Sequence, residues 1–219
     1  RFFMRYDLTS FWKFSTFAGI TNSFGSINDL YNGFILLSAK NLSAKNTDIQ
    51  QTKSNFVGSR LEYRNPLNNI FFNVSYNFND RTSNITYLNK LNVDSQQFIL
   101  EGYNLENNSK TNSARTELGK YFPKLKTNAS VGYNYSLSNY QQLPANSTPT
   151  ESSFIDVEGR NQGVSVKFNN NYFSWLSVDY NANWSFSKTQ SPDDSDFNNQ
   201  TDLFNHALSA YVYPFKNHT

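Results

Sequence analysis

Cysteine is absent from the 219 residues, which excludes disulfide bonds and cysteine-based metal sites. Histidine occurs only twice, and the sequence has no glycine-rich phosphate loop, no HExxH motif and no paired-histidine spacing. The longest hydrophobic run, Phe34–Leu37, is far shorter than the roughly 18 to 20 residues of a membrane-spanning helix. The net charge is +2, and no basic patch marks a nucleic-acid partner.

Aromatic residues are abundant, with 20 Phe and 14 Tyr, although hydrophobic residues make up only 37% of the chain and the mean hydropathy is −0.64. A soluble globular domain usually has an aliphatic core, and disordered chains are depleted in aromatic residues, so this composition is typical of neither. The chain begins with RFFMRY, inside a patterned segment and without a signal peptide. We therefore expect residues 1–219 to be a section of a longer protein.

Alternation of apolar and polar residues with a period of two predicts β-strands with one apolar face. It is strongest in Ile70–Asn79, Thr127–Asn139 and Leu176–Gln190. Weaker alternation, together with the short segment Arg1–Tyr6, brings the expected number of strands to nine, the others being Trp12–Thr21, Asn55–Arg64, Ala114–Tyr121, Gly163–Asn169 and Phe204–Tyr213.

Short and long connections alternate strictly between these strands. The short ones combine an aromatic residue or Leu with polar turn residues, and they are Asp7–Trp12, Arg64–Asn69, Tyr121–Lys126, Asn170–Trp175 and Tyr213–Asn217. The long ones are rich in Asn, Ser, Asp and Pro, and they are roughly Phe24–Gln50, Ile85–Thr111, Leu143–Ser153 and Ser191–Gln200. This order predicts an antiparallel meander with all short turns at one end.

The sorting of connections by length favours an all-β fold, a partial antiparallel transmembrane β-barrel in a bacterial outer membrane. Such barrels have short periplasmic turns, long extracellular loops, a lipid-facing apolar side and a polar lumen. Aromatic residues near the short turns predict a girdle at the membrane interface, formed by Trp12, Tyr121, Phe122, Tyr172, Phe173, Trp175, Tyr213 and Phe215. An odd strand number favours a piece of a larger barrel, whereas a miscount of one strand would leave a small eight-stranded barrel.

Charged residues recur on the polar side of the predicted strands. Lys13 and seven others are expected to face the lumen, namely Arg60, Glu62, Arg64, Arg115, Glu117, Lys167 and Asp179. They would contact a plug domain or a polar solute, or else form a ladder of charges that pair with one another. Several Asn-x-Ser/Thr triplets lie inside predicted strands, and we interpret them as part of the same polar face and not as glycosylation sites.

Three segments carry the strongest resemblance to a known family: NPLNNIFFNVSYNFNDRTSN, KYFPKLKTNASVGYNYSLSNYQQL and NNNYFSWLSVDYNANWSFSKTQ. Their rhythm of aromatic turn, alternating strand and Asn/Ser loop resembles the C-terminal barrel region of TonB-dependent receptor-like outer-membrane proteins of the Bacteroidetes type. The resemblance implies a barrel of about 22 strands around a plug, a periplasmic energy-coupling partner, and a role in solute uptake or gating.

Two segments have more than one interpretation. Asp193, Asp194 and Asp196 could ligate Ca²⁺, although the loop lacks the Gly and closing Glu of an EF-hand. Asn28–Asn46 has an apolar centre and would be a hairpin or strand extension above the membrane, or a docking patch for a surface lipoprotein. We expect no cofactor and no enzymatic activity, since His206 and His218 lie beside no nucleophile motif.

The sequence thus leaves three functions open. The first is a TonB-dependent receptor-like barrel for solute uptake or gating, surrounded by outer-membrane lipid. The second is a non-transporting barrel that acts as a structural or interaction subunit of an outer-membrane complex. The third is a secreted, soluble β-sandwich that binds glycans through its aromatic residues.

Overall fold

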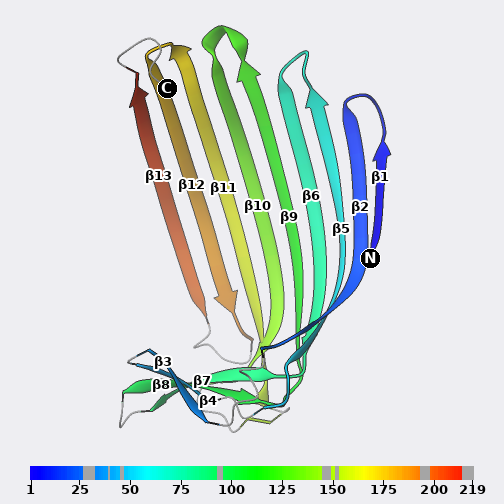
Figure 1. Cartoon of the computed structure of the whole chain (residues 1–219), viewed down its shortest axis with the longest axis vertical. Helices are drawn as coiled ribbons and strands as arrows, with labels where there is room; N and C mark the ends of the chain where they lie inside the picture. Colours follow the sequence, from blue (N-terminus) through cyan, green and yellow to red (C-terminus); the bar gives the residue numbers. More distant parts are fainter. Residues whose placement is uncertain are drawn as a thin grey trace.

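The computed structural model describes residues 1–26, 33–38, 40–44, 47–92, 96–144, 149–150, 153–192 and 198–213. These residues form an all-β structure with two sheets (Figure 1). The described part of the chain contains the short 3-10 turn Pro123–Leu125, and no helix that is long and apolar enough to cross a membrane.

The larger sheet has nine strands, and every pair of neighbours is antiparallel. In spatial order its strands are β1 (Phe2–Asp7), β2 (Trp12–Phe24), β5 (Gln51–Asn65), β6 (Ile70–Ser83), β9 (Asn107–Phe122), β10 (Thr127–Gln142), β11 (Ile155–Phe173), β12 (Leu176–Gln190) and β13 (Asn199–Val212). They run side by side as a meander, with the short turns at the upper end of Figure 1. The expected number and order of strands are therefore confirmed.

A smaller sheet lies at the other end, where the long connections are (Figure 1). Its strands, in spatial order, are β3 (Phe34–Ser38), β4 (Asn41–Ala44), β8 (Gln97–Tyr103) and β7 (Thr86–Asn92). β3–β4 and β7–β8 are antiparallel hairpins, and β4 pairs with β8 in parallel. The first two long connections therefore form one sheet together. The sequence analysis treated Ile85–Thr111 as a loop and did not predict its two strands, β7 and β8.

Side chains and left-handed residues fix the short turns. The Thr9 hydroxyl accepts hydrogen bonds from the backbone N–H groups of Phe11 (3.2 Å) and Trp12 (3.1 Å). The Asn65 side chain accepts two from the next turn, at Leu67 and Asn68. Asn69 and Lys126 have φ angles of 53° and 45°, which close their turns in the left-handed region.

The hydrophobic core of the described residues is small and lies at the long-connection end. It consists of Ile85, Leu88, Leu143, Ile155 and Val157, each at most 8% exposed. The Asn84 side chain ties the two long connections together, because it donates to the Ile49 carbonyl (3.1 Å) and accepts from the Gln51 N–H (2.6 Å). Most of the large sheet therefore has no apolar core on either side among these residues.

Candidate functional site

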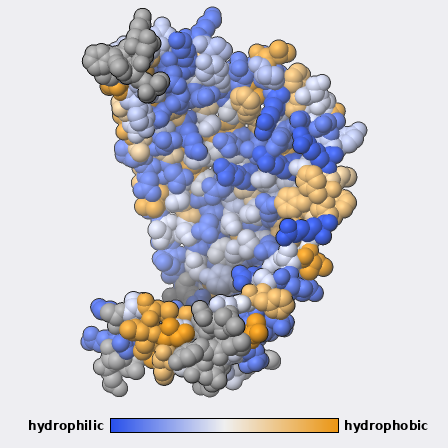
Figure 2. Space-filling view, in the orientation of Figure 1, coloured by the Kyte–Doolittle hydropathy of each residue, from blue (hydrophilic) through white to orange (hydrophobic). Residues whose placement is uncertain are grey.

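The two faces of the large sheet differ in chemistry. Cross-strand neighbours lie on one face of a sheet, so the strand register assigns every side chain to a side. One face carries an apolar belt, which we define as the apolar and aromatic residues of one parity from β2 to β13. The opposite face is polar, and it is the mostly hydrophilic surface turned to the viewer in Figure 2.

The apolar belt has the same width on most strands. It spans nine residues on five of the eight strands, as Trp12–Ile20, Ile70–Phe78, Ala114–Phe122, Ala129–Leu137 and Phe204–Val212, and eleven residues on β12, as Leu176–Phe186. It is shorter on β5 and β11. Thr16, Ser59, Thr116, Lys120 and His206 are its non-apolar members. Nine residues extend over about 27 Å of strand.

Both limits of the belt drift across the sheet. The register carries Trp12, the belt's first residue on β2, to His206 of β13, but there the belt begins six residues nearer the short turns, at Val212. The limit at the long-connection end shifts by the same amount. Ala18 of β2 aligns with Gln200 of β13, and the belt ends two residues beyond Ala18 on β2. On β13 it ends at Phe204, four residues before it reaches Gln200, so this limit also shifts by six residues. Six residues are about 20 Å and seven strand spacings about 34 Å, so the strands tilt by about 30° against the belt.

Aromatic residues concentrate at the short-turn limit of the belt. The Trp12 ring lies 4.8 Å from Tyr63 and 6.4 Å from Phe72. Further along, Phe173 contacts both Tyr172 (5.1 Å) and Trp175 (5.7 Å). Phe122, another residue of the expected girdle, lies on the belt side, and the Tyr213 N–H donates to the Trp175 carbonyl. Tyr121 does not fit the expected girdle, because it pairs with Asn128 on the polar face. Phe215 lies outside the described residues.

The polar face has a groove of about 610 Å³ near the short turns. All eight charged residues that the sequence placed on the polar side do lie on this face. Six of them line the groove, namely Arg60, Glu62, Arg64, Glu117, Lys167 and Asp179, whereas Lys13 and Arg115 lie outside its lining. Asn73, Asn128, Asn169 and Asn181 add amide groups.

The charges in and beside the groove are arranged in rows across the strands. Arg60 of β5 and Arg115 of β9 flank Ser75 of β6 in one row. The next row holds Glu62 and Glu117 on either side of Asn73.

Ion pairs run along the strands between these rows, from Arg60 to Glu62 (2.7 Å) and from Arg115 to Glu117 (3.6 Å). Arg64 lies 3.9 Å from Glu62, and the Asn169 amide donates to Asp179. These partly exposed pairs contribute little stability, below about 1 kcal/mol each. The groove offers a polar solute or a docked polypeptide guanidinium and amide donors beside carboxylate acceptors.

Glycines on the polar face leave room for side chains of the neighbouring strands, a feature that the sequence analysis did not find. All six glycines of the large sheet lie on this face, namely Gly19, Gly58, Gly119, Gly132, Gly159 and Gly163. A Cβ atom at Gly163 would lie 2.5 Å from the Asn134 Oδ1 atom, and one at Gly132 would lie 2.7 Å from the Ser165 Oγ atom. At these positions the neighbouring side chains occupy the space beside the glycine, so a larger residue would collide with them.

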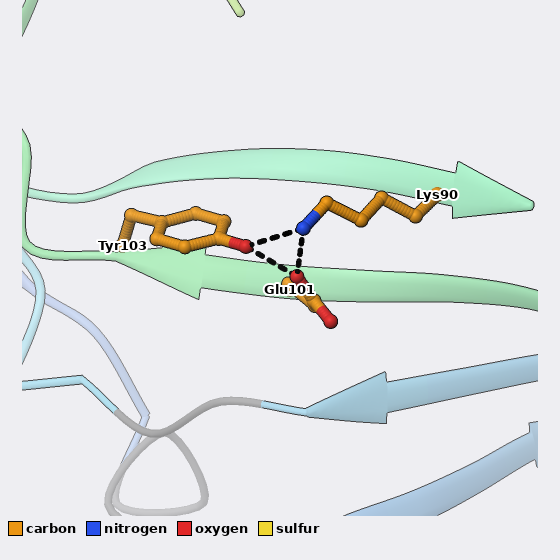
Figure 3. Close-up of polar contacts among 3 residues, drawn as sticks. All are labelled: Lys90, Glu101 and Tyr103. Atoms are coloured by element: carbon orange, nitrogen blue, oxygen red, sulfur yellow. Dashed lines mark hydrogen bonds and ion pairs between the residues drawn. The ribbon is translucent and has the colours of Figure 1, made fainter. Parts of the chain in front are cut away.

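A second polar cluster, also missed from sequence, lies on β7 and β8 of the small sheet (Figure 3). The Lys90 ammonium group donates to the Glu101 carboxylate (2.8 Å) and the Tyr103 hydroxyl (2.9 Å), and that hydroxyl donates to Glu101. The hydrogen bonds to Glu101 and Tyr103 raise the pKa of Lys90. Burial raises the pKa of Tyr103, and it would also raise that of Glu101, but the hydrogen bonds from Lys90 and Tyr103 outweigh it and lower the Glu101 pKa. This cluster links the two strands of the β7–β8 hairpin.

The remaining sequence-predicted residues form no chemical site among the described residues. Asp193, Asp194 and Asp196 lie outside the described residues, and within these no three His, Cys, Asp or Glu side chains group around a metal position. His206 lies in the belt and stacks on Phe204 (5.5 Å). The segment Asn28–Asn46 contains the β3–β4 hairpin, as one of its two interpretations predicted.

No model of a known protein family matches the sequence, and no curated protein matches it either.

Proposed function

We propose that the nine-stranded sheet is a section of a transmembrane β-barrel in a bacterial outer membrane. We further propose that the barrel belongs to a TonB-dependent receptor-like protein that takes part in solute uptake or gating. The belt's geometry is the observation that carries the first proposal, and the polar groove with the sequence resemblance supports the second.

The belt has the dimensions of a lipid-facing band. About 27 Å of strand at a tilt of about 30° gives a height of about 23 Å, close to the roughly 25 Å apolar band of outer-membrane barrels. A belt of similar width on most strands that crosses the strands obliquely fits a flat slab cutting a tilted sheet. An interior face of a soluble domain has no reason to keep such limits.

The two edges of the sheet support closure by further strands. All six residues of β1 and all fourteen residues of β13 are exposed, and β1 and β13 do not pair with each other. Unpaired backbone groups are costly in lipid, and long exposed edges promote aggregation in water. Additional strands of a larger barrel would satisfy both edges.

The polar groove then forms part of the lumen wall near the periplasmic end. Arg60, Glu62, Arg64 and Glu117 would contact a plug domain or a passing polar solute there, together with Lys167, Asp179 and the neighbouring Arg115. A plug and a periplasmic energy-coupling partner follow from the family resemblance alone. On the lipid side, an Arg or Lys at mid-bilayer would cost about 2 to 4 kcal/mol, which agrees with the position of these charges on the opposite face.

A non-transporting subunit of an outer-membrane complex is the second candidate, because the small sheet exposes apolar side chains. Phe34, Leu36 and Leu37 of the β3 hairpin are more than 60% exposed, and Leu91 and Phe98 are about half exposed. Hydrophobic residues gather on this sheet in Figure 2. Such surfaces often mark interaction sites. The third candidate, a soluble β-sandwich, needs a second sheet over the belt, and none of the described residues supplies one.

The experiment that tests uptake is a gene deletion in the source bacterium, complemented with the wild type or with an Arg60→Gln/Arg115→Gln variant. Uptake of a panel of solutes is measured with and without a protonophore. We expect loss of protonophore-sensitive uptake of one solute class in the deletion strain and reduced uptake in the variant. Unchanged uptake of every solute, combined with dissociation of an outer-membrane complex, would favour the second candidate.

A further inference from the structure

A second pocket, of about 290 Å³, opens on the belt side at the short-turn end of β9, β10 and β11. It is lined by Phe122, Leu125, Thr127, Phe168, Asn170 and Tyr172. The four large side chains are between 38% and 56% exposed, so the pocket is an open apolar surface. It lies at the limit of the belt, where hydrocarbon would give way to headgroups if the belt spans a membrane.

Hydrogen bonds hold the pocket in shape. The Asn170 amide donates to the Leu125 carbonyl (3.1 Å) and to the Thr127 hydroxyl (2.6 Å), and that hydroxyl donates to the same carbonyl (2.8 Å). The Asn171 N–H donates to the Lys126 carbonyl (3.0 Å). The turn after β9 is thereby fixed to β11, so a ligand would meet a preformed surface.

Three exposed lysines, Lys120, Lys124 and Lys126, lie within two residues of the pocket residues Phe122, Leu125 and Thr127 in the sequence. The Lys120 ammonium group lies 5.2 Å from the centre of the Phe122 ring, at the pocket wall. None of the three forms an ion pair with a described residue. On the belt side of the large sheet, the described carboxylates all lie toward the opposite end, at Asp80, Asp156, Glu158 and Asp202. The charge at the pocket is therefore positive.

We propose that this pocket seats an anionic phospholipid, with an acyl chain against Phe122, Phe168 and Tyr172 and the phosphate at the lysines. The inference rests on the proposed membrane insertion. Apolar area and an anionic headgroup beside cations are the two terms that bind lipid at an interface, and each lysine near an anionic lipid contributes about 1 kcal/mol. A soluble anion would use the lysines but leave the apolar pocket empty.

Trp175 is a reporter for the test, because its ring contacts Phe173, which contacts Tyr172 of the pocket. A Trp12→Phe/Trp184→Phe variant leaves Trp175 as the one tryptophan of residues 1–219, and any tryptophan outside them is replaced by phenylalanine as well. This protein is reconstituted into phosphatidylcholine vesicles with a minor share of phosphatidylglycerol, and either lipid is brominated on its acyl chains to quench fluorescence. We expect phosphatidylglycerol to be enriched at Trp175 at least about fivefold, the ratio that corresponds to one lysine at about 1 kcal/mol.

Removing the charge should remove the preference. Lys120→Gln/Lys124→Gln/Lys126→Gln is expected to lower the enrichment to about onefold, and Lys124→Gln alone to lower it partly. The matched control, Lys53→Gln/Lys110→Gln/Lys188→Gln, removes three lysines of the same face at the far end and should keep the enrichment. Equal loss in both triple variants would overturn the site.

The failure of this inference can be told from failure of the proposed function. Quenching by both lipids without preference would mean that the sheet is inserted but has no anionic lipid site. Absence of quenching by either lipid would mean that the sheet does not enter the bilayer, and both proposals would then be wrong.

Discussion

Phe17 of β2 covers Gly58 of β5 on the polar face: a Cβ atom at Gly58 would lie 2.3 Å from the Phe17 Cζ atom. The reverse pair sits beside it, with Phe56 over Gly19 at 2.7 Å. Each ring occupies the space that a side chain on the neighbouring strand would need. The two rings are 6.2 Å apart. Such pairs of glycine and aromatic residue let the face stay crowded without overlap.

Gly58→Val should therefore destabilise the sheet by about 1 to 3 kcal/mol, the usual cost of overpacking. The new side chain would meet both Phe17 and the Asn77 side chain, whose Oδ1 atom is 2.6 Å from the Cβ position. The measurement is the urea midpoint of refolded protein in detergent. Gly119→Val is the matched control, since the Cβ atom there would have its nearest neighbour at 3.6 Å, and it should cost less stability. Equal losses in both variants would contradict the crowding argument.

The assignment of the two faces predicts that an arginine is costly on the belt and tolerated on the polar face at the same depth in the membrane. Ala182 lies near the middle of the belt on β12, and Asn183 is its neighbour on the polar face. Ala182→Arg should lower folding stability in bilayers by about 2 to 4 kcal/mol, whereas Asn183→Arg should change it little. Heat modifiability on gels after folding into vesicles measures the difference. Similar behaviour of the two variants would mean that the faces are assigned wrongly.

Orientation in the membrane is tested by labelling single introduced cysteines, because residues 1–219 contain no cysteine. A cysteine at Asn198, at the long-connection end, should react with an impermeant maleimide added to intact cells. A cysteine at Asn68, in the short turn after β5, should react only after the cells are opened. Labelling of Asn68 from outside would reverse or reject the proposed topology.

The cluster of Lys90, Glu101 and Tyr103 predicts a pH range for the small sheet. The Glu101 pKa is lowered, so its stabilisation is present above its unfolded pKa of about 4.3 and is lost as the pH falls through the folded value. The Lys90 pKa is raised, so its stabilisation is present below about 10.4 and is lost as the pH rises through the folded value. Amide protection in β7 and β8 should be highest between these limits.

Glu101→Gln should remove the decline at acid pH, with an effect below about 1 kcal/mol because the group is partly exposed. Protection factors from hydrogen exchange at Leu88 and Ile99 measure it. Glu106→Gln, which replaces an exposed carboxylate in the same connection, is the control and should keep the decline. An acid decline that persists in Glu101→Gln would show that another group is responsible.

Sequence alone predicted all nine strands and the face of each of the eight charged residues, because alternation is a local pattern. At the long-connection end the predicted strands were shorter than those in the structure. The strand expected at Gly163–Asn169 extends over Ile155–Phe173 in the structure. Beyond the belt both sides become polar, as at Glu158, Arg160 and Asn161, so the contrast between odd and even positions disappears while the backbone pairing continues.

The small sheet could not be predicted in the same way. Its central contact joins β4 to β8 in parallel, for example Leu42 to Ile99, across more than fifty residues. Local patterns contain no information on such pairing. Tyr121 is a different case, because the alternation of Arg115 and Glu117 on the same strand already places it on the polar face, next to Phe122 on the belt side. Counting both as girdle residues overlooked a signal that the sequence contained.

The most direct test of the central proposal is a nitroxide scan along β10, one introduced cysteine at a time from Thr127 to Gln142, in reconstituted bilayers. Oxygen, which partitions into lipid, should reach labels at Ala129, Val131, Tyr133, Tyr135 and Leu137 far better than those between them. The alternation should end after Leu137, where Asn139 and Gln141 continue the same parity in water. Equal access of a water-soluble relaxation agent to both parities along the whole strand would contradict a lipid-facing belt.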